Sequence, residues 1–141
     1  MKKNLYKMAF AITVLSIAAL SLDSCKKEED EGKLPNISLK TDTGYTSGDA
    51  TIAKSTIFKI GVQASKAEDK DLLTKFTITR AYDAGADSTV YTKDLSGGEG
   101  DSYSYDYSTA TRPITGKEKY TFTVVNKDGL VNKSVVTLTV Q

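Results

Sequence analysis

The segment 55–65, STIFKIGVQAS, indicates the fold class because its apolar and polar side chains alternate along its whole length. Alternation with a period of two is typical of a strand with one buried face, whereas a helix repeats every 3.6 residues. The apolar positions that share one face are Phe58, Ile60, Val62 and Ala64. The opposite face carries Lys59, Gly61 and Gln63. We therefore expect a strand here that buries the first face.

Six further segments on either side show the same period: 36–40, 73–82, 88–93, 102–108, 118–126 and 134–140. They are rich in β-branched and aromatic residues, which strands prefer. Turn-forming stretches of Gly, Asp and Asn separate them at 83–85, 96–100 and 126–129. Seven short alternating strands predict an all-β sandwich over residues 35–141. A helix is expected at most as one turn at 66–71.

A local motif sharpens this prediction. The stretch 116–122, GKEKYTF, is similar to the start of strand F in immunoglobulin-like domains. The resemblance implies that Tyr120 is the tyrosine of a tyrosine corner, with its hydroxyl bonded back to the backbone. The segment 120–140 also looks like the final hairpin of bacterial immunoglobulin-like and polycystic-kidney-disease-type modules. Together these likenesses imply a seven-stranded antiparallel immunoglobulin-like β-sandwich.

The first 24 residues differ in character from the rest of the chain. Lys2, Lys3 and Lys7 precede the uncharged run 8–20, MAFAITVLSIAAL. This run is shorter than the roughly 20 residues that a membrane-spanning helix needs. A basic start followed by a short apolar run is typical of a secretory signal, so residues 1–24 are predicted to be a signal peptide.

The stretch 22–25, LDSC, resembles a bacterial lipobox, and the whole signal resembles those of Bacteroidota lipoproteins. The resemblance implies that Cys25 is acylated and anchors the protein in the outer membrane. Acyl chains bind a bilayer through about 0.8 kcal/mol per buried methylene. Residues 25–34 are then a charged flexible tether. Its acidic run 28–31 is similar to a surface-display signal, which favours the cell surface, while the periplasmic face remains an alternative.

Composition argues against several classes of function. The chain has no histidine, the commonest general base and a frequent zinc ligand, and its single cysteine is Cys25. Without residues 1–24, which carry three of the 19 basic and one of the 18 acidic residues, the net charge is −1. This near-neutral charge lacks the excess of basic residues that nucleic-acid binding requires, so we expect no nucleic-acid partner. The acidic loops 83–87 and 126–129 lack the calcium-loop pattern and are interpreted as turns.

These observations predict no catalytic residue, no metal site and no cofactor, and a protein that is not an enzyme. The one segment that suggests binding is 101–107, DSYSYDY, where Tyr103, Tyr105 and Tyr107 share one face of a strand. If that face meets solvent, it is an aromatic stripe that could bind a glycan or a protein. If it faces the core, the hydroxyls must find partners or reach the rim.

Three hypotheses for function remain from the sequence. The first is a membrane-anchored, non-catalytic binding or adhesion module for a glycan or a protein at the cell envelope. The second is an accessory subunit of an outer-membrane assembly in which the sandwich is a spacer. The third is an enzyme that uses a pair of carboxylates. The first is the prediction, and an exposed tyrosine stripe would distinguish it from the second.

Overall fold

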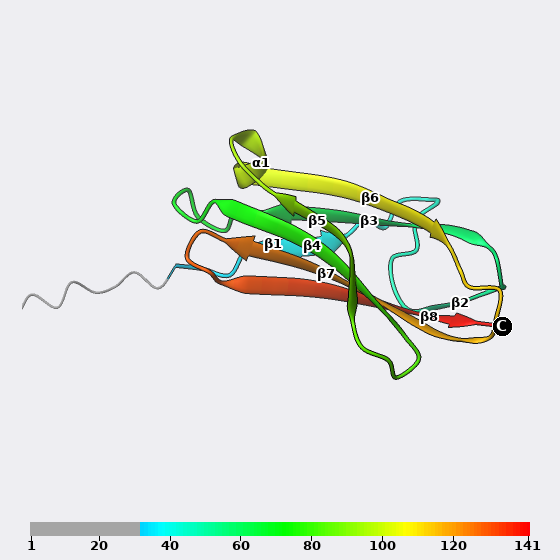
Figure 1. Cartoon of the computed structure of the whole chain (residues 1–141). Helices are drawn as coiled ribbons and strands as arrows, with labels where there is room; N and C mark the ends of the chain where they lie inside the picture. The colour runs from blue at the N-terminus through cyan, green and yellow to red at the C-terminus, as the bar shows by residue number, and fades with distance from the viewer. Residues whose placement is uncertain (1–31) are drawn as a thin grey trace, which may run out of the picture.

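The computed structural model describes residues 32–141 as two packed β-sheets (Figure 1). The smaller sheet has the strand order β1 (Asn36–Leu39), β3 (Ile57–Ser65), β6 (Ser102–Ala110). The larger has the order β2 (Ala50–Ile52), β8 (Val131–Val140), β7 (Gly116–Asn126), β4 (Leu73–Tyr82), β5 (Ser88–Asp94). The predicted signal peptide and Cys25 lie outside the described residues.

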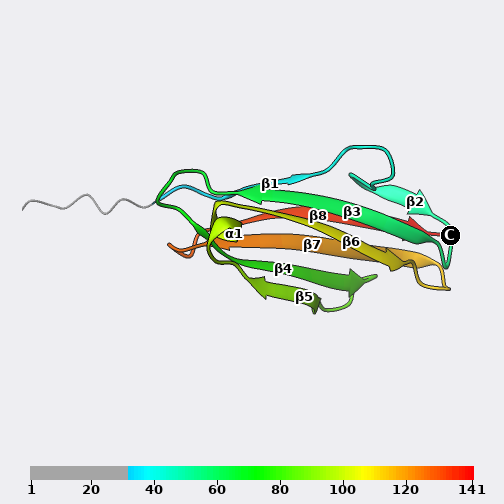
Figure 2. The same ribbon diagram turned by 90° about the horizontal axis from the view of Figure 1, so that it is seen from above.

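The architecture of residues 32–141 confirms an all-β domain with two facing sheets, which is compatible with an immunoglobulin-like sandwich. The first described residues and the C-terminus lie at opposite ends of the domain (Figure 2). The loops β3–β4 and β7–β8 and the short helix α1 (Gly98–Asp101) lie at the end where the described chain begins. Strand β5 lies at one edge of the larger sheet and β6 at one edge of the smaller sheet, and the two follow one another in the chain.

The core is made by the inward faces of both sheets, as the alternation predicts. On β3 the four apolar positions Phe58, Ile60, Val62 and Ala64 are all buried. The larger sheet contributes a second buried set, which consists of Phe76, Ile78, Tyr120, Phe122, Val124, Val136, Leu138 and Val140. Both faces of this interface are therefore mainly apolar, which accounts for the packing of the two sheets.

The prediction of seven antiparallel strands is wrong in two respects. Residues 32–141 form eight strands, because the prediction missed β2, and β2 pairs with β8 in parallel. Three residues are too few to show a period of two, and the partner strand lies almost 90 residues later in the chain. The remaining strand pairs are antiparallel.

The helical turn is also misplaced. Residues 66–71 form bends and turns, whereas the only helical turn among the described residues is α1 in the glycine-rich stretch. Gly97 precedes α1 with φ of 56°, a left-handed conformation that glycine adopts without strain. Gly97 and α1 lie in the connection by which the chain crosses from β5 in one sheet to β6 in the other.

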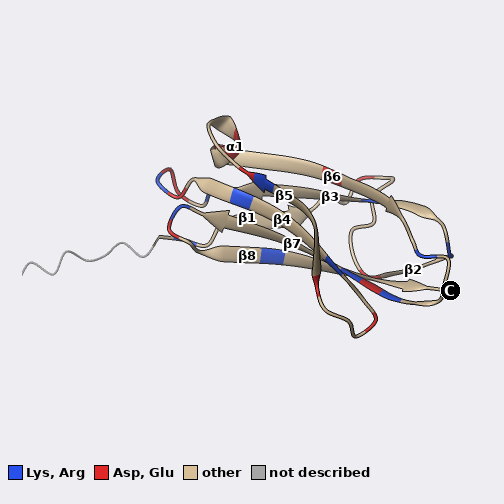
Figure 3. Ribbon diagram, in the orientation of Figure 1, with Lys and Arg blue, Asp and Glu red and all other residues tan. Residues whose placement is uncertain are grey.

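Charged side chains of both signs are dispersed over the domain, largely in loops and near strand ends (Figure 3). Neither sign covers a whole sheet in this view. This distribution agrees with the near-neutral charge of residues 25–141.

Candidate functional site

The predicted tyrosine stripe on β6 faces the interior of the sandwich. Tyr103 is buried, and Tyr105 and Tyr107 are half-buried against the core. The ring of Tyr103 lies 5.2 Å from that of Phe76, and the ring of Tyr107 lies 5.6 Å from that of Tyr120. The three tyrosines therefore do not form a solvent-facing stripe, because Ser104 and Asp106 between them take the outward positions.

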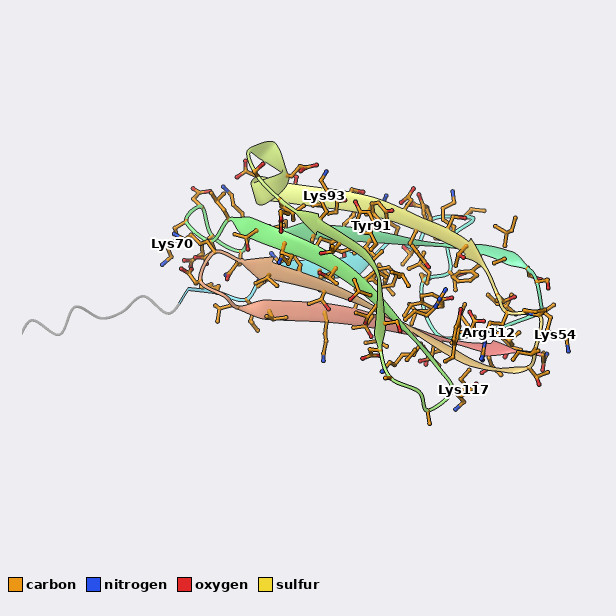
Figure 4. The ribbon with its side chains drawn as sticks, in the orientation of Figure 1. Lys54, Lys70, Tyr91, Lys93, Arg112 and Lys117 are labelled. Atoms are coloured by element: carbon orange, nitrogen blue, oxygen red, sulfur yellow. The ribbon has the colours of Figure 1, made fainter. Side chains whose placement is uncertain are left out.

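The stripe closes the side of the sandwich where the edge strands β5 and β6 approach one another. Tyr105 stacks on Tyr91 of β5 with ring centroids 4.3 Å apart, and the hydroxyls of Tyr91 and Tyr103 are 3.1 Å apart. Figure 4 labels Tyr91 and Lys93 on this side of the domain. Burial raises the pKa of the Tyr105 hydroxyl and of the Tyr103 hydroxyl, so both stay protonated at neutral pH.

Tyr120, the expected corner tyrosine, is fully buried, and its hydroxyl donates to a side chain. The acceptor is Oε2 of Glu118, 2.7 Å away, where the resemblance implied a backbone oxygen. Glu118 lies two residues before Tyr120 on the same face of β7. Its carboxylate is therefore close enough to accept the hydrogen bond in place of a backbone oxygen. The other oxygen, Oε1, accepts the Arg112 backbone N–H at 2.7 Å. This buried group holds the β6–β7 connection against β7, and its role is structural.

The surface feature best suited to binding is a hollow of about 630 Å³ on the smaller sheet. It crosses β1, β3 and β6 at the end of the domain where the described chain begins. Two rows of paired outward residues form its floor: Asn36, Ser65 and Ser102, then Ser38, Gln63 and Ser104. Asn132 of β8 also lines it. We call this hollow the sheet groove.

The floor is polar because the alternation of each strand sends its apolar side chains into the core. Hydroxyl and amide groups remain on the outer face, and each can both donate and accept hydrogen bonds. The two rows lie two residues apart along each strand, or about 7 Å. The sheet groove therefore carries regularly spaced, uncharged hydrogen-bonding groups, and Ile37, Ala64 and Tyr103 of the same three strands also line it.

The next row along the strands, which we call the wall, lies beside the groove and is not among the residues that line it. Tyr45, from the β1–β2 loop, lies over Gly61 of β3 and donates its hydroxyl to Oδ2 of Asp106 at 2.7 Å. Lys40 donates to Oδ1 of the same carboxylate at 2.6 Å. Gly61 is required here, because a Cβ at this position would lie 2.6 Å from the Tyr45 ring and 2.6 Å from Lys40 Cδ. Lys59 lies 4.9 Å from the ring centroid.

Hydrogen bonds keep Asp106, Lys40 and Tyr45 in this wall each in a single protonation state. Hydrogen bonds from Lys40 and Tyr45 lower the pKa of Asp106, and the same bonds raise the pKa of Lys40 and of Tyr45. The carboxylate is therefore ionised, the ammonium charged and the phenol neutral over the whole physiological range. The wall combines an aromatic ring with a fixed pair of opposite charges.

Cys25, the predicted lipidation site, lies outside the described residues. Within residues 32–141 there is no helix long and apolar enough to cross a bilayer. The same residues contain no cluster of three or more His, Cys, Asp or Glu side chains placed to hold a metal ion.

No protein-family model matches the sequence, and no curated protein sequence matches it either. Solved structures with a similar fold include superoxide reductase (neelaredoxin) from Ignicoccus hospitalis, with a TM-score of 0.51 and 5% identity. That match covers 77% of this chain and 81% of the other. Murine CRIg matches with a TM-score of 0.43 and 10% identity, over 77% of this chain and 99% of the other.

The prediction that the chain is not an enzyme is contradicted by the first of these likenesses. It rested on the absence of histidine and of a catalytic motif, yet a protein of similar fold is named as a reductase. At 5% identity the likeness shows the fold alone, and it transfers no activity or metal site to this chain. The fold is therefore no ground for excluding catalysis.

The sequence analysis missed the sheet groove and its wall. Serine, asparagine and glutamine at outward strand positions give no signal of their own, and Tyr45 lies in a loop. One signal was available: a glycine inside a central strand often marks close approach by another group, and Gly61 is such a residue.

Proposed function

We propose that this protein is a glycan-binding module of a bacterial cell-envelope lipoprotein, and that the glycan lies in the sheet groove. The observation that carries the proposal is the floor of two rows of hydroxyl and amide side chains across three strands. A sugar presents many hydroxyls that both donate and accept hydrogen bonds, and these floor groups do the same. The volume of about 630 Å³ is within the usual range for small-ligand sites.

Tyr45 adds the second element that a sugar site needs. An amphipathic aromatic ring can pack against the apolar face of a sugar ring while its hydroxyl remains bonded to Asp106. Because Gly61 and Asp106 hold the ring in place, little side-chain entropy is lost when a ligand packs on it.

The cellular setting is part of the same proposal. The likeness to Bacteroidota lipoproteins supports a signal peptide at 1–24, acylation of Cys25 and a tether over 25–34. It also supports an outer-membrane location with the immunoglobulin-like domain displayed at the cell surface. The test of the anchor is a Cys25→Ala variant, which should leave the membrane fraction. Retention of that variant in the membrane would contradict the anchor.

A second candidate, an accessory subunit with the sandwich as a spacer, is favoured by the inward-facing tyrosine stripe. Affinity electrophoresis separates the two candidates. The protein is run through gels that contain soluble starch, xylan, mannan or mucin. We expect at least one of these to retard the wild type and a Thr121→Ala control on the outer face of the larger sheet. Gln63→Ala and Tyr45→Ala should migrate freely. Equal retardation of all four proteins, or of none, would contradict glycan binding in the groove.

A further inference from the structure

The end of the domain where the described chain begins contains a buried carboxylate with one unpaired oxygen. Asp71, in the β3–β4 loop, is fully buried. Its Oδ2 accepts the Lys33 backbone N–H at 2.9 Å, but its Oδ1 has no hydrogen-bond partner. A buried carboxylate oxygen without a partner is costly, since it has lost its water and gained nothing in return.

A second carboxylate approaches the same space from another loop. A Cβ placed on Gly32 would lie 3.3 Å from Asp71 Oδ1 and 2.8 Å from Asp128 Oδ2. Both oxygens therefore lie close to the position that a side chain on Gly32 would take. Gly32 has φ of 66°, so any other residue would be strained there as well.

The turn itself does not use the Asp128 carboxylate. Residues 126–129 form the predicted turn, in which Asn126 Oδ1 accepts the backbone N–H groups of Asp128 at 3.1 Å and Leu130 at 2.9 Å. Asn126 Nδ2 donates to the Lys33 carbonyl at 3.0 Å. These bonds fix the β7–β8 turn against the first described residues and bring Asp128 to the space beside Gly32.

Two of the lysines at this end of the domain form ion pairs with a different acid, Glu68. Lys33 and Lys70 both form ion pairs with Glu68 (Lys70 is labelled in Figure 4). The pKa of Lys33 is raised mainly by its hydrogen bond with Glu68, and the charge of Asp71 contributes less. No ion pair among the described residues joins a lysine to Asp71 or Asp128.

We propose that Asp71 and Asp128 bind a Ca²⁺ ion between them. Calcium takes carboxylate, carbonyl and water oxygens in a flexible shell, whereas zinc prefers nitrogen or sulfur ligands. With two protein carboxylates the site is of the weak kind found in extracellular modules, with a Kd of about 0.1–1 mM. The ion would give Asp71 Oδ1 its missing partner. It would also join the β3–β4 loop, the β7–β8 turn and the start of the described chain.

The test is the thermal unfolding of the full-length chain in detergent, first in EDTA and then in about 10 mM CaCl₂ at constant ionic strength. Binding at this affinity should raise the Tm of the wild type by about 5 °C or more. The matched control Asp94→Asn replaces an exposed acid whose one ion pair within residues 32–141 is a loose one to Lys75, and it should show the same rise.

Asp128→Asn and Asp71→Asn should each lose the calcium-dependent rise. Because Asp128 is exposed, the Asp128→Asn variant should fold. It therefore tests calcium binding even if the Asp71→Asn variant fails to fold. The proposal is overturned if calcium leaves the wild-type Tm unchanged, or if Asp128→Asn retains the full rise. An equal rise with MgCl₂ would mean general screening by divalent ions and would also overturn it.

Discussion

Gly61→Ala is the substitution that separates the sheet groove from the fold. The added methyl would lie 2.6 Å from Tyr45 Cε1 and 2.6 Å from Lys40 Cδ. Carbon atoms in ordinary contact are about 3.5–4.0 Å apart, so the tyrosine ring must move away from the sheet by about 1 Å. Gly61 has an ordinary strand conformation and its new side chain points away from the core, so the backbone accepts alanine.

The two consequences differ in size. The fold gains about 0.4–1 kcal/mol from the smaller entropy of the unfolded chain and loses a comparable amount of packing under the ring. The net change in the free energy of unfolding should stay within about 1 kcal/mol, or about 5 °C in Tm. The position of the Tyr45 ring beside the groove is lost. We expect about a tenfold weaker affinity for a polysaccharide that retards the wild type, which corresponds to about 1.4 kcal/mol.

The assay pairs thermal unfolding with affinity electrophoresis. Gly48→Ala is the matched control, because a Cβ there meets no atom within 4 Å. If Gly61→Ala binds as tightly as Gly48→Ala, Tyr45 is no part of the site. If its Tm falls by more than about 10 °C, Gly61 serves the fold and the reasoning about the groove wall fails.

Three further predictions concern stability. Tyr120→Phe leaves Glu118 Oε2 buried without its hydroxyl partner and should cost about 2 kcal/mol in chemical unfolding; a cost under about 0.5 kcal/mol would contradict the buried pair. Tyr103→Ala removes a core ring and should cost about 3–5 kcal/mol, whereas a surface residue would cost almost nothing. Because the pKa of Asp106 is lowered in the folded state, its bonds stabilise the fold above about pH 4, and this is lost as the pH falls through the folded value. Asp106→Asn should therefore unfold with a shallower dependence on pH below about 4, and an unchanged slope would show that these bonds add nothing.

Much of the fold could be predicted from the sequence. The period of two placed Phe58, Ile60, Val62 and Ala64 on the buried face of β3, and the structure confirms all four. Strand β2 and its parallel pairing could not be predicted, because three residues carry no period and the pairing spans distant parts of the chain. The same limit applies to α1, which depends on the left-handed conformation of one glycine.

The site could be predicted only in part. Alternation showed that the three tyrosines of β6 share a face, but it does not say which face is inward. The packing of Tyr103 and Tyr105 against Phe76 and Tyr91 decides that question. The sheet groove depends on the register between β1, β3 and β6, which aligns Asn36 with Ser65 and Ser102. No local pattern in the sequence contains that register.

The most direct test of the central claim is to map the ligand contact by NMR. A soluble oligosaccharide from a polysaccharide that retards the protein is added to the ¹⁵N-labelled chain. Our account predicts that the largest amide shifts fall on Gln63, Ser104 and Tyr45 on the outer face of the smaller sheet. Shifts confined to the outer face of the larger sheet, at Thr77, Thr121 or Thr137, would contradict it.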